Sequence, residues 1–197
     1  MKKIITLLLF AVVVSQGMAG DSRNSRYNAN GNSIPIQVEA GWNLISLPTS
    51  ITNGVKTAIF PSATSEAYVY DNSYVLKDTL GNGNGFWLKF GSPQTIYIPG
   101  DTLFNKGIAV KKGWNIIGAL SMPVPTKVIY SEPAGIISST YYSYKPGAGY
   151  QEADTIQPGK GCWIKVNQDG VIFLTEPGSG KITFSDSLRS VVLDSVD

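Results

Sequence analysis

The side chains of this sequence that could recognise a ligand are its aromatic rings, because the usual catalytic residues are scarce. The chain contains no histidine and a single cysteine, which excludes Ser-His-Asp and Cys-His nucleophilic systems, His-ligated metal sites and thiolate clusters. It contains 4 tryptophans, 10 tyrosines and 7 phenylalanines, and such rings combine a large apolar face with, in tryptophan and tyrosine, a polar edge. Sugar rings stack on such faces, so carbohydrate is the ligand class that exposed aromatic residues of this chain would suit.

The ligand-binding candidates are Trp87, Trp163, Tyr144 and Tyr150. In the strand that holds each tryptophan, the two-residue period puts the indole on the face that also carries a lysine, and the binding interpretation requires that face to be partly exposed. The alternative is that each indole covers a turn or packs against the tyrosine-bearing strand, because large aromatic side chains are usually mostly buried. Solvent exposure separates the two: a coplanar row of exposed rings favours binding, and buried indoles favour a structural role.

The other two tryptophans, Trp42 and Trp114, stand in Gly-Trp-Asn elements that are apolar on both faces, so we expect them in the core. The asparagines that follow them, Asn43 and Asn115, are expected to bond neighbouring backbone in a bulged strand. Cys162 takes the place of a phenylalanine of the first copy of its motif. We expect it to be a small buried hydrophobic residue rather than a reactive thiol.

The acidic residues supply no recognisable catalytic motif. Asp78 and Asp154 recur at equivalent positions, each followed by threonine. A turn that satisfies backbone amides is favoured there over a calcium site, because calcium loops usually concentrate several acids. No pair of carboxylates stands in a glycosidase-like pattern. We therefore expect no catalytic residue, no metal site and no cofactor, and we interpret the chain as non-enzymatic.

The sequence segments that are expected to form the elements around these residues occur twice in the chain. Residues 38–45 return as residues 110–117, and residues 78–89 return as residues 154–165, in the same order. The repeating unit is about 70 residues long, which indicates an internal duplication. In each copy a glycine-rich loop precedes a strand rather than a helix, so a hairpin connection is favoured over a phosphate-binding loop.

These motifs together resemble a known module. The pattern is a strand ending in Gly-Trp-Asn, a Tyr-x-Tyr strand and then Gly-x-Gly-(Phe/Cys)-Trp, and it covers residues 38–90 and 110–166. It is similar to the tandem β-rich repeats of secreted and cell-surface bacterial proteins, which often stand beside fibronectin-like or C-terminal sorting domains. No activity is established for that module, so the resemblance implies location and architecture rather than chemistry.

Each copy has the pattern of many short β-strands. Apolar and aromatic runs are separated by turns that use the chain's 21 glycines and 11 prolines. Single helical turns are the most that residues 53–60 and 125–130 predict. We expect an all-β fold, a duplicated β-sandwich or partly open barrel whose two repeats share one core and are related by a pseudo-two-fold axis. The predicted strands include residues 34–38, 67–70, 86–90 and 95–98, and residues 107–110, 141–144, 162–166 and 171–174.

The N-terminus predicts export. Two lysines precede an apolar run that is short for a membrane span, and small residues end at Ala19, so residues 1–19 are a predicted signal peptide. Without them, basic and acidic residues are equal in number, so the remaining chain has no net positive charge that would favour nucleic-acid binding. We also expect no membrane insertion once the signal peptide is removed. The remaining predicted divisions are a flexible lead-in at residues 20–33, repeat 1 at 34–106, repeat 2 at 107–176 and a C-terminal strand or tail at 177–197.

The sequence therefore predicts an exported structural or adhesive β-module of the bacterial cell envelope or surface, located in the periplasm, on the cell surface or outside the cell. A carbohydrate-binding module that uses exposed aromatic residues is the alternative. The expected partner is a glycan or a cell-envelope protein.

Overall fold

The computed structural model of the chain describes residues 33–176. The predicted signal peptide, the lead-in before Ser33 and the C-terminal tail lie outside the described residues. Strand β1 begins at Ser33, the last residue of the predicted lead-in, and β9 begins at Asn105, shortly before the predicted second repeat. Within the described residues no helix is long and apolar enough to cross a membrane.

The first half of the described chain contains one four-stranded sheet and two two-stranded ribbons. The sheet has the order β2-β6-β4-β5, β1 pairs with β7, and β3 pairs with β8. A short helix, α1 (Lys56–Ile59), lies in the region where one helical turn is predicted. The strands are β1 (Ser33–Val38), β2 (Gly41–Ser46), β3 (Thr49–Ser50), β4 (Ala67–Tyr70), β5 (Tyr74–Lys77), β6 (Gly85–Phe90), β7 (Gln94–Pro99) and β8 (Asp101–Thr102).

The second half repeats the four-stranded sheet and the pairing of its first and last strands, but its other pairings differ. Its four-stranded sheet has the order β10-β16-β13-β14, β9 pairs with β17, on which the extra strand β12 also pairs, and β11 pairs with β15. The 3-10 helix η2 covers Thr126–Val128. The strands are β9 (Asn105–Val110), β10 (Gly113–Ile117), β11 (Val124–Pro125), β12 (Tyr130–Glu132), β13 (Tyr142–Lys145), β14 (Gly149–Glu152), β15 (Thr155–Ile156), β16 (Cys162–Val166) and β17 (Gly170–Thr175).

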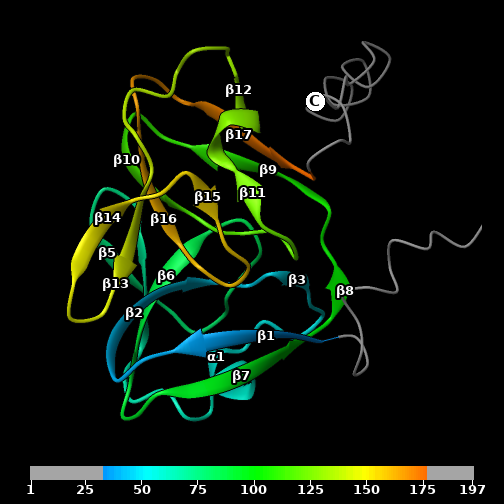
Figure 1. Cartoon of the computed structure of the whole chain (residues 1–197), viewed down its shortest axis with the longest axis vertical. Helices are drawn as coiled ribbons and strands as arrows, with labels where there is room; N and C mark the ends of the chain where they lie inside the picture. The colour runs from blue at the N-terminus through cyan, green and yellow to red at the C-terminus, as the bar shows by residue number, and fades with distance from the viewer. Residues whose placement is uncertain (1–32, 177–197) are drawn as a thin grey trace, which may run out of the picture.

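The all-β prediction is confirmed. The sheets of residues 33–176 are antiparallel, and none of them closes into a barrel. In Figure 1 the β1–β7 ribbon lies at the bottom of the molecule, and β9, β12 and β17 lie toward the top. The predicted strands are present, because alternating apolar runs in this chain fall between tight turns. The short strand β12 was not predicted, since its Tyr-Ser-Glu sequence carries no apolar alternation.

The apolar side chains form three clusters rather than one shared core. Each half has a cluster of its own, and a third lies between the halves. The first-half cluster includes Phe60, Phe86 and Phe90, whose rings meet edge to face. The third cluster consists of Leu44, Trp87, Ile116 and Trp163, with Tyr68, Tyr70, Tyr142 and Tyr144 packed against it.

The glycine-rich loops join the two halves by hydrogen bonds that occur in matched pairs. The Ser46 amide donates to the Gly159 carbonyl at 3.0 Å, and the Gly118 amide donates to the Gly83 carbonyl at 2.7 Å. Each bond links the end of a Gly-Trp-Asn strand in one half to the loop of the other half. Reciprocal contacts of this kind are what a two-fold relation requires; the pseudo-two-fold axis itself stays a prediction.

These loops need glycine because they are pressed against the opposite half. A Cβ at Gly85 would collide with Ile116, and a Cβ at Gly159 would collide with Ile36. The loop of the second half also sends the Lys160 ammonium to the Gln37 carbonyl at 2.7 Å, and burial lowers the pKa of that amine. The hairpin interpretation of the loops is wrong, because β5 and β6 are separated by β4 in their sheet and β15 pairs with β11 rather than with β16. The loops instead join the two halves.

Candidate binding site

The Gly-Trp-Asn motif is a turn that directs a tryptophan outward. Gly41 lies between β1 and β2 with φ of 93°, a left-handed conformation that glycine adopts without strain. The Asn43 side chain closes the turn: its Oδ1 accepts from the Glu39 amide at 3.0 Å, and its Nδ2 donates to the Glu39 and Gly41 carbonyls at 2.8 and 3.0 Å. Trp42 stands between these two fixed residues, so its backbone is rigid where its side chain begins.

The second copy repeats this turn closely. Gly113 has φ of 106°, and Asn115 exchanges hydrogen bonds with the Lys111 backbone at 3.0 and 2.7 Å. The expectation that these asparagines bond neighbouring backbone is confirmed: each lies in a strand, β2 or β10, and its side chain bonds the backbone of the turn before that strand. The expectation that Trp42 and Trp114 are core residues is wrong: they are 39% and 40% exposed.

The candidates Trp87 and Trp163 are the more buried pair, at 8% and 9% exposure. Trp87 lies directly across from Leu44 on β2 and Tyr68 on β4. The predicted faces are as expected from the two-residue period: Phe86 belongs to the first-half cluster and Trp87 to the cluster between the halves. The partial exposure that the binding interpretation requires is not observed, and both indoles pack beside the tyrosine-bearing strands instead.

Rings from opposite halves meet edge to face in this shared cluster. The Trp87 and Tyr144 centroids lie 4.7 Å apart at 75°, and the Tyr70 and Trp163 centroids lie 4.8 Å apart at 69°. Edge-to-face contacts at this separation are favourable for aromatic rings. Candidate Tyr144 is therefore partly buried against Trp87, and the rings make perpendicular walls rather than a coplanar row.

Two hollows open beside this cluster, and aromatic residues line both. The first, which we call the Trp42 pocket, has a volume of about 390 Å³, within the range of small-molecule sites. Candidate Tyr150 stands at its rim with 55% of its surface exposed. The lining residues are Trp42, Tyr68, Tyr74, Trp87, Tyr144 and Tyr150.

The second hollow, which we call the Trp114 pocket, has a volume of about 420 Å³. Tyr150 borders it as well, so this residue lies between the two pockets. The lining residues are Tyr70, Trp114, Tyr142, Tyr150 and Trp163. The structure thus brings all four sequence candidates to these two pockets. It adds six residues that sequence reasoning did not select, namely Trp42, Tyr68, Tyr70, Tyr74, Trp114 and Tyr142.

The polar groups of the pockets are few and neutral. Partial burial raises the pKa of Tyr150, with Tyr74 acting in the same direction and the Trp163 indole opposing the shift, so the phenol stays protonated at neutral pH. The indole Nε1 atoms of Trp87 and Trp163 are buried and make no hydrogen bond of normal geometry with the described residues. Such a site can hold an apolar ring and offer it neutral hydrogen-bond donors.

The other positions considered in the sequence have structural roles. The Asp78 carbonyl accepts from the Lys56 amide at 2.8 Å, and the Asp154 carbonyl accepts from the Thr126 amide at 2.7 Å, so each aspartate fixes the start of a helical turn through its backbone. Within residues 33–176, no group of three or more histidine, cysteine, aspartate or glutamate side chains is placed to hold a metal ion.

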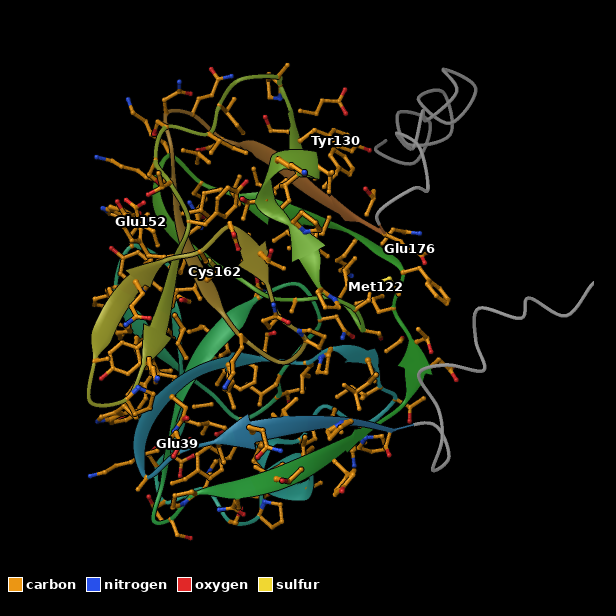
Figure 2. All side chains as sticks on the ribbon, viewed as in Figure 1. Glu39, Met122, Tyr130, Glu152, Cys162 and Glu176 are labelled. Carbon is orange, nitrogen blue, oxygen red and sulfur yellow. The ribbon has the colours of Figure 1, made fainter. Side chains whose placement is uncertain are left out.

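Cys162 lies inside the second half (Figure 2) and is 2% exposed. Burial raises the pKa of its thiol to about 12, so the thiolate is not formed at neutral pH. The expectation of a buried hydrophobic cysteine is confirmed by this position.

Comparison of the chain with protein-family models, with curated proteins and with solved structures finds no match. The geometry of the pockets is therefore the basis for a functional proposal. The signal that could have identified Trp42 and Trp114 is the glycine before each of them, because a left-handed turn at a strand start leaves the next side chain near the edge of the sheet.

Proposed function

We propose that this chain is a non-enzymatic, exported carbohydrate-binding module that acts in adhesion at the bacterial cell envelope or surface. The observation that carries the proposal is the Trp42 pocket, whose lining residues are all tryptophan or tyrosine. Apolar walls with hydroxyl and indole groups at their edges suit a sugar ring, which has apolar C–H faces and a polar rim. The export signal predicted at residues 1–19 supports the location.

The arrangement of the rings favours one form of carbohydrate over another. Trp87 meets Tyr144 and Tyr150 at 75° and 85°, so these three rings form no flat platform for the surface of a crystalline polysaccharide. A pocket with perpendicular walls instead encloses one sugar ring from two sides. The ligand we propose is therefore the end or a side branch of a soluble glycan chain.

The unpaired indole donors support a ligand with hydroxyl groups. Buried polar groups in proteins usually have a hydrogen-bond partner, and the Nε1 atoms of Trp87 and Trp163 have none of normal geometry among the described residues. A saccharide hydroxyl would supply an acceptor after a small movement of a neighbouring ring. A purely apolar ligand would not.

The test is a titration of the purified protein with soluble oligosaccharides, followed by tryptophan fluorescence. The proposal expects a saturable change for at least one saccharide and its loss in Trp42→Ala. Asn167→Ala, outside both pockets, is the control for unspecific effects. The absence of any saturable change across neutral and charged saccharides, or binding that survives Trp42→Ala unchanged, would contradict the proposal.

A further inference from the structure

Each exposed tryptophan has a lysine directly opposite on the neighbouring strand. Trp42 on β2 pairs with Lys89 on β6, and Trp114 on β10 pairs with Lys165 on β16. Directly opposed residues of an antiparallel pair point to the same face of the sheet, with Cβ atoms about 5 Å apart. A lysine side chain therefore lies on the same sheet face as the exposed tryptophan of each pocket.

The two lysines differ in what they contact. The Lys165 ammonium lies 5.9 Å from the centroid of the Trp114 ring, a distance at which a cation is attracted to an indole face. Lys89 makes no such contact with Trp42, and within the described residues its ammonium forms no ion pair with a carboxylate. Its backbone is held by Ser65 and Thr64, so an exposed ammonium projects from a fixed position.

The acidic residues do not distinguish the pockets, because no aspartate or glutamate lines either of them. On the edge strands, Leu76 lies across from Tyr68 and Glu152 lies across from Tyr142, the latter toward the left of the molecule in Figure 2. The difference between the pockets therefore lies in their lysines: the Lys165 ammonium lies near the Trp114 ring, and Lys89 has no such contact with Trp42.

We propose that the Trp42 pocket selects anionic saccharides, with the sugar ring between the aromatic walls and its negative group paired with the Lys89 ammonium. The inference rests on the proposed carbohydrate binding and deepens it. A uronate carboxylate is the simplest such group; a sulfate ester presents the same charge. Charge-assisted hydrogen bonds to carboxylate or sulfate oxygens are shorter and stronger than neutral ones.

The test compares three trisaccharide probes by calorimetry: oligogalacturonate, its carboxyl-reduced neutral form and a sulfated galactan fragment. We expect oligogalacturonate to bind about fivefold more tightly than the neutral form at low salt, which is the size of an exposed ion pair. The preference should weaken at high salt because screening reduces the attraction between exposed charges. Tighter binding of the sulfated fragment than of oligogalacturonate would assign the charge to sulfate and overturn the uronate assignment.

Matched variants identify the charge. Lys89→Met should reduce the affinity for oligogalacturonate to that for the neutral form, and Lys165→Met should leave the preference intact. Both lysines are exposed, so neither variant disturbs the core. A preference that persists in Lys89→Met, or equal binding of acidic and neutral forms by the unchanged protein, overturns this inference while leaving the proposed function standing. Failure of all three probes to bind overturns both.

Discussion

The Trp42 and Trp114 pockets contain the same Gly-Trp-Asn motif, but different side chains contact the two tryptophans. Their tryptophans have nearly the same exposure, 39% and 40%, yet Trp114 contacts Tyr142, Trp163 and Lys165, whereas Trp42 contacts Tyr68. One indole thus has the protein's own cation 5.9 Å from its ring centroid, and the other has no such neighbour. The similar strand pairings of the two halves place the two tryptophans alike. The side chains that contact each indole ring decide which pocket can accept a ligand.

The glycine loops differ between the halves in a similar way. Gly83 and Gly159 both have positive φ, of 96° and 74°. A Cβ at Gly83 would lie 3.3 Å from the ends of the Ile108 and Lys106 side chains, which can move, whereas a Cβ at Gly159 would collide with the branched Cβ region of Ile36. The second-half loop is therefore the more tightly packed of the two.

The largest expected effect comes from Gly159→Ala. Overpacking against Ile36, added to the cost of a left-handed alanine, should lower the free energy of unfolding by about 2–4 kcal/mol. Gly83→Ala, its counterpart in the first half, should cost about 1 kcal/mol. Urea unfolding followed by tryptophan fluorescence measures both, and equal losses would show that the loops are equally tight.

The second effect separates the pockets by ligand binding. Trp42→Ala should weaken saccharide binding by about tenfold or more, because it removes an aromatic anchor from the open pocket. Trp114→Ala should change the dissociation constant by less than about threefold, since the Lys165 ammonium already interacts with that ring. Calorimetric titration measures the constants. A larger loss in Trp114→Ala than in Trp42→Ala would assign binding to the other pocket.

The same two variants should affect the free energy of unfolding in the opposite order, with the larger loss in Trp114→Ala. Trp114 has two aromatic partners and a cation at its ring, so Trp114→Ala should cost about 1 kcal/mol more than Trp42→Ala in the free energy of unfolding. Thermal unfolding without ligand gives the comparison. If Trp42→Ala were the more destabilising variant, the view of Trp42 as the freer ring would be wrong.

The smallest expected effect concerns Cys162, which replaces Phe86 at the equivalent core position. Burial raises the pKa of its thiol to about 12. The thiol therefore stays protonated between pH 7 and pH 9, and the reactive thiolate forms only above that range. Native protein should show no labelling by a thiol reagent at pH 8, and one equivalent should react after unfolding. Rapid labelling of the native protein would place the thiol outside the core.

Much of the fold could be predicted from the sequence because strand periodicity is local. Alternation in residues 86–90 and 162–166 correctly separated core-facing from tryptophan-bearing faces, and the duplicated motifs marked equivalent strands. Burial depth could not be predicted in this way. Trp87 is covered by Tyr144 of the other half, and Trp42 remains open, because both depend on how the two sheets meet rather than on either strand.

The candidate site was predicted in part for the same reason. Tyr144 and Tyr150 were selected by composition and do line the Trp42 pocket. Trp42 was missed because a two-sided apolar pattern is typical of a buried strand. The pattern gives no information on the packing of the two halves, and the first residues of this strand are not buried by the opposite half.

The most direct test of the account follows the four indole N–H signals of the protein by two-dimensional NMR during titration with acidic and neutral oligosaccharides. The account predicts slow hydrogen exchange for Trp87 and Trp163, fast exchange for Trp42 and Trp114, and a saturable shift that is largest for Trp42 and small for Trp114. A shift confined to Trp114, or no shift of any indole signal with any saccharide, would contradict the claim that the Trp42 pocket binds carbohydrate.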